Sequence, residues 1–232
     1  MGVFLLAVGE RSIRTALEIE AARSSTSGEP SVEMFSRGTQ LVGGVVASLL
    51  YGLFVGCIFG VVFAAVRHHS RLRDDFGRAL GLGAIAFGTL VLVPALKYPA
   101  NPPAVGDPGT VGSRTVAYLT LLAAAVVLAL AAWWASRALR QRGLPDHMRL
   151  TAVAAGYVAA VALAYVVWPA SRDRIDVPAT LVWRFRLAAL GGAAALWAVL
   201  AVVFGWACVR ASARACSGSA GQPPAELAGR TG

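Results

Sequence analysis

Hydrophobic residues gather in five long runs along the chain, and none of the runs contains Asp, Glu, Lys, Arg or His. The runs cover residues 41–66, 79–96, 116–136, 150–168 and 187–209. A helix of about 20 apolar residues crosses a hydrocarbon core of about 30 Å, so each run is long enough to span a bilayer. None shows the alternation of apolar and polar residues that marks a strand of an outer-membrane barrel. The pattern predicts an all-α, polytopic transmembrane helix bundle that forms a single domain over residues 1–216.

The two ends of the chain differ from these runs. Residues 1–8 are apolar, but as a helix they rise only about 12 Å, so we interpret them as the truncated end of an N-terminal transmembrane helix. Residues 10–23 place Ile13, Leu17 and Ala21 at helical spacing, which predicts an amphipathic helix at the membrane surface. Residues 217–232 are rich in Gly, Ser, Pro and Ala, which predicts a disordered tail.

Composition supports the membrane assignment, because 57% of the residues are hydrophobic, 14% are charged and the mean hydropathy is +0.64. The net charge of +9 does not indicate nucleic-acid binding, since the basic residues fall in short loops between the runs. Arg and Lys are slightly more frequent in the loops on the C-terminal side, and most acids fall on the other side. We therefore expect the C-terminus to be cytoplasmic and the loop that follows Lys97 to lie outside.

Residues 97–115 form the segment richest in proline and glycine between two apolar runs. Prolines lack a backbone donor and push the preceding residue toward an extended conformation, so this segment is predicted to be a fixed loop. Ser113 is expected to cap the N-terminus of the next helix. Pro94, near the end of the preceding run, predicts a kink or a stop there.

Two further patterns concern packing and anchoring. Gly52, Gly56 and Gly60 recur every four residues, which favours close packing of another helix over the lining of a permeation path. A cluster of aromatic and basic residues before the last run is typical of an anchor at the membrane interface. Its members are Trp183, Arg184 and Arg186.

The loop carries a resemblance. Leu-Lys-Tyr-Pro-Ala-Asn-Pro-Pro-Ala-Val-Gly-Asp-Pro at 96–108, followed by Gly112 and Arg114-Thr115, resembles the signature loop of the CbtA family, the proposed cobalt transporter subunit of bacteria. Further similarities lie at 9–10, 36–40 and 181–187 and extend to about residue 206. The chain departs from the family at its N-terminus, where family members have a full first helix.

The resemblance implies a membrane subunit of a cobalt, or divalent metal cation, uptake system linked to cobalamin synthesis. It also implies a bacterial cytoplasmic membrane location and a small single-span partner with a histidine-rich terminus. Cobalt(II) is expected as a substrate, with no permanently bound cofactor. Cobalt(II) suits imidazole and carboxylate ligands, and the apolar runs contain neither. We therefore expect a metal site outside the membrane, completed by the partner's histidines or built from the oxygen-bearing side chains of Tyr98, Asn101, Asp107, Glu10, Glu18 and Glu20.

Lys97 and Arg114 flank the loop and are expected to position it, or to pair with acids. In the alternative interpretation the loop oxygens only satisfy backbone groups while Lys97 and Arg114 anchor at lipid headgroups. The glutamates likewise form either a solvated face or a cation-collecting surface.

Two other function classes were considered. The sequence contains no nucleophile paired with a base and no phosphate-binding glycine loop with its lysine, so an enzyme is not expected. A non-transporting scaffold or assembly subunit remains the alternative, because the first run carries a glycine stripe and no run contains a charge. That alternative predicts copurification with a partner and no metal flux.

Overall fold

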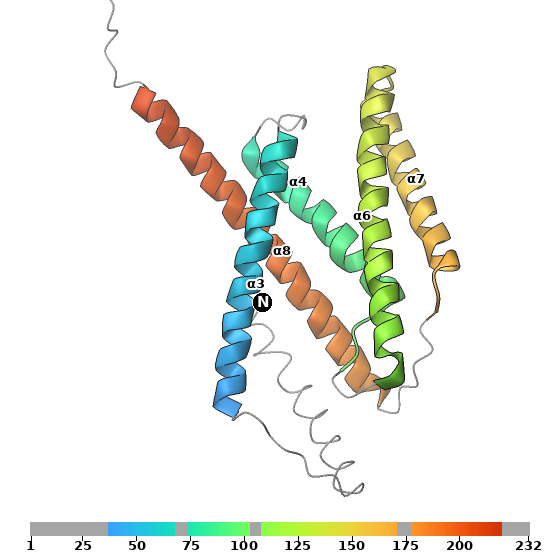
Figure 1. The fold of residues 1–232 in the computed structure, drawn as a ribbon. Helices are drawn as coiled ribbons and strands as arrows, with labels where there is room; N and C mark the ends of the chain where they lie inside the picture. The colour runs from blue at the N-terminus through green and yellow to red at the C-terminus, as the bar shows by residue number, and fades with distance from the viewer. Residues whose placement is uncertain (1–36, 68–73, 103–107, 171–177, 220–232) are drawn as a thin grey trace, which may run out of the picture.

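The computed structural model describes residues 37–67, 74–102, 108–170 and 178–219, and every regular element in these ranges is a helix (Figure 1). Five stretches are long and apolar enough to cross a membrane, which confirms the predicted polytopic helical fold. Residues 1–8 and 10–23 lie outside the described residues. The elements are α3 Arg37–Val66, α4 Asp75–Phe87, the π-helical turn η3 Gly88–Leu92, α5 Val93–Lys97, the 3-10 turn η4 Pro108–Thr110, α6 Val111–Gln141, α7 Asp146–Val167 and α8 Ala179–Ser219.

Most helices extend beyond the apolar runs that predict them. α6 covers 111–141 around the run at 116–136, and α8 covers 179–219 around the run at 187–209. The added residues include several Ala and Arg, which are strong helix formers. α8 therefore continues to Ser219, into the start of the segment expected to be disordered.

The start of α6 differs from the sequence expectation. Thr110, not Ser113, is the N-cap residue, and the hydroxyl of Ser113 donates to the Thr110 carbonyl at 2.9 Å. The expectation of a cap at Ser113 is therefore wrong, because the turn η4 starts the helix one turn earlier than the local sequence signal suggests.

Successive long helices run in alternating directions, so the molecule has two distinct ends (Figure 1). One end holds the residues after α5, the residues after α7 and the start of α8. The other holds the end of α3, the start of α4 and the short turn from α6 to α7. Residues 98–102, 168–170 and 178–186, which are distant in sequence, thus meet at one end.

The main core lies where α4 and α8 cross and α3 covers them. Ala79 is fully buried, Ala201 is 2% exposed, and both belong to one cluster with Phe59, Phe63 and Trp197. Phe204 of α8 packs edge-on against Phe59 and Phe63, with ring centroids 5.2 and 5.0 Å apart respectively. The packing joins α3, α4 and α8 into one unit.

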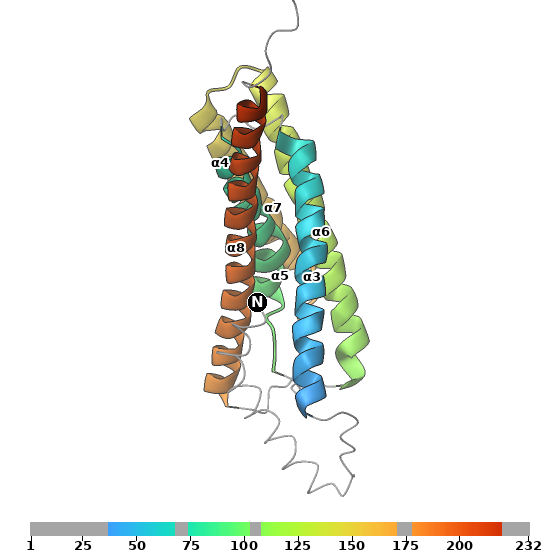
Figure 2. The same ribbon diagram turned by 90° about the vertical axis from the view of Figure 1, so that its left-hand side faces the viewer.

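α6 and α7 form a second unit, a hairpin whose two helices pack against each other (Figure 2). Among the described residues, α6 meets the first unit mainly at η3 and α5. Outward apolar side chains such as Leu49 and Val166 are 69% and 82% exposed, as expected of helices that face lipid. The contact between the two units is thus concentrated beside the loop after Lys97.

Candidate functional site

The segment Tyr98–Pro102 leaves the membrane helix at a place prepared by Pro94. Proline has no N–H to donate to the preceding turn, and the chain adopts π-helical bonding there, with the Val93 N–H donating to the Gly88 carbonyl. The disturbance predicted at Pro94 is thus a π-helical turn followed by one more turn of helix. Tyr98 then caps the helix, and its N–H donates to the Pro94 carbonyl at 2.8 Å.

Two side chains tie this helix end to α7. The Lys97 ammonium donates to the Tyr165 carbonyl at 2.7 Å, and the Tyr98 hydroxyl donates to the Pro169 carbonyl at 2.6 Å. A cation at the C-terminal end of a helix is favourable because the last carbonyls there lack helical partners. In the other direction, the Tyr165 hydroxyl of α7 donates to the Val93 carbonyl of α5. The end of α5 and the end of α7 are therefore locked together.

A third side chain ties the loop to α8. Arg186 donates from Nη2 to the Asn101 side-chain oxygen at 2.9 Å and from Nε to the Ala100 carbonyl at 3.3 Å. A guanidinium presents several donors in a fixed plane, so it holds two acceptors of one loop in register. We call the contacts made by Lys97, Tyr98 and Arg186 the clasp, and the clasp joins α5, α7 and α8 at one end of the molecule.

The clasp has a defined chemical character. Tyr98 donates its proton to a carbonyl, and Asn101 uses its oxygen to accept from an arginine. Burial raises the pKa of Tyr98, which keeps its hydroxyl protonated as a donor. The structure therefore uses these two candidate ligands as structural hydrogen-bonding groups.

The other candidate ligands are distributed differently. Asp107, Glu10, Glu18 and Glu20 lie outside the described residues. Arg114 lies near the start of α6 and is half-buried. Within the described ranges, no group of three or more His, Cys, Asp or Glu side chains comes together. Of the candidate site, the clasp is therefore the part that lies within the described residues.

The comparison with protein families decides the affiliation. The model of the family described as "Probable cobalt transporter subunit (CbtA)" matches residues 1–209. This chain belongs to the CbtA family. No curated protein and no solved structure gave a significant match to the chain. The match covers all five apolar runs together with the clasp, so this CbtA fold contains both.

Several residues of this CbtA chain were not singled out in the sequence analysis. Tyr165 and Pro169 receive the clasp through backbone carbonyls, and the Trp168 indole N–H donates to the Thr120 hydroxyl at 3.1 Å. The sequence signal for them was the Trp-Pro pair that ends the fourth apolar run. Every residue has a backbone carbonyl, so the amino-acid type does not reveal which carbonyls accept these hydrogen bonds. Only the folded arrangement of the helices does.

The residues predicted for packing and anchoring take separate positions. An added Cβ at Gly56 would lie 3.8 Å from Leu200, and one at Gly60 would lie 3.5 Å from Phe204, so both glycines face α8. Gly52 has no described neighbour within 4 Å of that position. Trp183 is 62% exposed and Arg184 is also exposed, whereas Arg186 of the same cluster belongs to the clasp.

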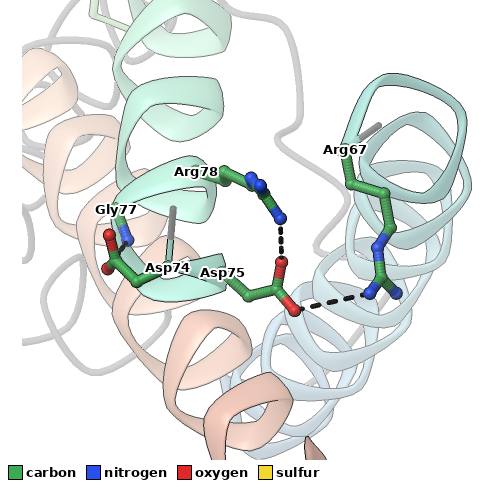
Figure 3. A network of polar contacts seen from close by, with 5 residues as sticks. All are labelled: Arg67, Asp74, Asp75, Gly77 and Arg78. Carbon is green, nitrogen blue, oxygen red and sulfur yellow. Dashed lines mark hydrogen bonds and ion pairs between the residues drawn. The ribbon is translucent and has the colours of Figure 1, made fainter. Parts of the chain in front are cut away.

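The opposite end of this CbtA molecule holds a second polar network, drawn in Figure 3. The Asp75 carboxylate lies 2.8 Å from Nη1 of Arg78 and 3.6 Å from Nη2 of Arg67, while Asp74 accepts from the Gly77 N–H at 2.7 Å (Figure 3). Two guanidinium groups beside one carboxylate leave no excess negative charge for a metal ion. This network ties the end of α3 to the start of α4.

Proposed function

We propose that the chain is the membrane subunit of a cobalt(II) uptake system that supplies cobalamin synthesis. The observation that carries this proposal is the family match over residues 1–209, which covers all five apolar runs. Cobalt(II) is the cargo in this proposal. The word subunit in the family description supports a partner, and we propose a single-span membrane protein with a histidine-rich terminus.

Asp107 is the proposed metal ligand that follows the clasp residues in the sequence. Asp107 follows Pro102 after a short stretch, and the clasp fixes the start of that stretch by holding Tyr98, Ala100 and Asn101. A held loop start limits where the Asp107 carboxylate can lie, which reduces the ordering cost of metal binding. Glu10, Glu18, Glu20 and the partner's histidines complete the proposed ligand set, because cobalt(II) suits carboxylate and imidazole.

The proposed orientation in a bacterial cytoplasmic membrane places the clasp outside and the C-terminus in the cytoplasm. The arginine-rich turn between α6 and α7 lies at the opposite end from the clasp (Figure 1). Basic loops are enriched on the cytoplasmic side of membrane proteins. This arrangement supports an entry route in which the metal meets the clasp end first.

Uptake of radiolabelled cobalt in cells that lack other cobalt importers tests the proposal. The partner is expressed in each strain, and membrane levels of the chain are measured in parallel. Asp107→Asn removes a carboxylate ligand and should lower uptake about tenfold without lowering membrane insertion, since a loss of about 1.4 kcal/mol in metal binding is a tenfold change in affinity. Glu226→Gln in the tail makes the same charge change and should leave uptake unaltered. Uptake that survives Asp107→Asn would contradict the proposed ligand.

The clasp also favours a second candidate, a scaffold subunit that carries no metal itself. In that role Tyr98 and Asn101 only hold helices together, and their hydrogen bonds with Pro169 and Arg186 support this candidate. Affinity purification with the partner distinguishes the two. A stable complex in cells that show no cobalt uptake would establish the scaffold, whereas uptake that depends on both chains would establish the transporter.

A further inference from the structure

The turn between α6 and α7 gathers arginines at the end of the molecule opposite the clasp. Three come from the last turns of α6 and just beyond it, and one lies in the first turn of α7. Asp146 is the acid among them. We call this group the arginine turn, and its members are Arg137, Arg140, Arg142 and Arg149.

Arg149 is the unusual member, because only 5% of its surface is exposed. Nη1 lies 3.1 Å from a carboxylate oxygen of Asp146, yet Nη1 and Nε are both buried without a hydrogen-bond acceptor among the described residues. The Nε of Arg140 is buried without an acceptor as well. Buried guanidinium donors without acceptors are costly. An anion held at the accessible edge of these guanidinium groups would offset part of that cost through charge attraction.

The backbone adds to the positive potential at this place. α7 is Asp146–Val167, and its N-cap residue is Pro145, whose side chain makes no capping hydrogen bond. The N-terminus of a helix carries partial positive charge and backbone N–H groups that point toward an anion. The Asp146 side chain is 50% exposed, so solvent screens its charge and the arginine turn keeps a positive excess.

The position of the arginine turn relative to the membrane indicates which class of anion it binds. Arg137 directly follows the uncharged run 116–136, and Arg149 directly precedes the run 150–168, so both guanidinium groups lie at the membrane–water boundary. Arg137 lies 4.8 Å from the centre of the Trp133 ring, an aromatic at headgroup level. Met148 and Leu150 beside Arg149 are 56% and 58% exposed and offer apolar contact to acyl chains. Phosphate groups of phospholipids lie at this level.

We propose that the arginine turn binds the phosphate group of an anionic phospholipid. Arg140 and Arg149 hold the phosphate oxygens, the N-terminus of α7 adds backbone donors, and the acyl chains run along the hairpin of α6 and α7. A planar guanidinium can donate two parallel hydrogen bonds to one phosphate, which makes arginine suited to this role. The proposal stands independently of which cation the protein carries.

Native mass spectrometry of the full chain in detergent tests the site, with equal amounts of phosphatidylglycerol and phosphatidylcholine as probes. The wild-type protein should retain phosphatidylglycerol about tenfold more than phosphatidylcholine. Arg140→Gln and Arg149→Gln should bring that ratio close to one. Arg210→Gln is the control, because Arg210 lies at the same end on α8, 3.5 Å over the Trp206 ring, and loses the same charge. Its ratio should match that of the wild type.

Arg149→Lys tests the role of the guanidinium if Arg149→Gln does not fold. It keeps the charge but loses the paired donors, so the preference should fall severalfold while the elution profile of the protein stays unchanged. A wild-type ratio near one, or a full preference in both Arg140→Gln and Arg149→Lys, would overturn the proposal. Release of phosphatidylglycerol by about 10 mM inorganic phosphate would also overturn it, because free phosphate would then be the ligand.

Discussion

Arg186 and Tyr98 show how single side chains hold the loop end of the molecule. Each reaches across from one helix end to a carbonyl or amide on another, at donor–acceptor distances between 2.6 and 3.3 Å. Hydrogen bonds of this kind contribute little each. Of the three acceptors only the Asn101 side-chain oxygen is half-buried, so the loss of its donor is the most costly, whereas the Pro169 and Ala100 carbonyls belong to exposed residues. Substitutions here should therefore alter stability before they alter metal chemistry.

Replacing Arg186 with Gln should lower the stability of the folded protein. The change removes the hydrogen bonds to Asn101 and Ala100, and because Arg186 is half-buried the expected loss is about 1 kcal/mol. The midpoint of thermal unfolding in detergent measures the effect. Arg184→Gln is the matched control, since exposed Arg184 loses the same charge from the same helix and should change stability by under about 0.5 kcal/mol. Equal losses in both variants would show that charge, not the clasp, is responsible.

The Tyr98 hydroxyl should give the molecule a pH-dependent stability at alkaline pH. Burial raises its pKa above the ordinary value of 10.0, so the folded state retains the proton while the unfolded state loses it. The contribution is complete below about pH 10 and is lost as pH rises through the higher folded pKa. Tyr98→Phe should remove this component, so the stability difference between the two proteins shrinks above about pH 10. A constant difference up to pH values well above that would contradict the assignment.

Much of the clasp could be picked out from the sequence, but its partners could not. Lys97, Tyr98 and Asn101 stand out as polar side chains of the proline-rich signature loop, and Arg186 stands out as part of an aromatic and basic cluster before the last apolar run. Their acceptors at Pro169 and Ala100 are main-chain carbonyls, which every residue carries. Only the folded arrangement of α5, α7 and α8 shows which carbonyl each donor meets.

At the scale of elements, the crossing of α4 and α8 is the tightest contact between helices. An added Cβ at Gly83 would lie 2.6 Å from the Cβ of Ala201, closer than side chains tolerate. At Gly205 it would meet Phe76 at 3.0 Å and Ala79 at 3.1 Å. Glycine is required at this crossing because it lets two helix backbones approach. The regular stripe at Gly52, Gly56 and Gly60 is conspicuous in the sequence because its spacing is visible there, whereas the point at which two helices cross is not.

Gly83→Ala should therefore destabilise the protein, although alanine forms helices better than glycine. The expected loss is about 1–3 kcal/mol, because the added methyl group forces the helices apart. Gly52→Ala serves as the control, since its added methyl group meets no described atom within 4 Å. That variant should be neutral or gain up to about 1 kcal/mol. Thermal unfolding of both variants measures the difference, and a stable Gly83→Ala protein would mean that α4 and α8 do not cross as described.

At the scale of the whole molecule, the sequence predicted the fold class better than the arrangement. The five spans followed from the length of uncharged runs, because a bilayer of fixed thickness selects helices of a given length. Helix pairing did not follow, because membrane helices are apolar on lipid-facing and protein-facing sides alike. The helices divide into one unit of α3, α4 and α8 and another of α6 and α7. Local contacts distinguish the two units, such as the close approach of Gly83 to α8 and the hydrogen bond from Trp168 to Thr120.

The position of the clasp at one end of a long hairpin has a mechanical consequence. α6 has 31 residues and is therefore about 46 Å long. A rotation of about 10° around the clasp moves the far end of such a rod by about 8 Å. In such a rotation the hairpin would act as a lever whose fulcrum lies at the clasp and whose long arm ends at the arginine turn. A small rotation of the hairpin at the clasp would therefore produce a larger displacement of the arginine turn at the other membrane face.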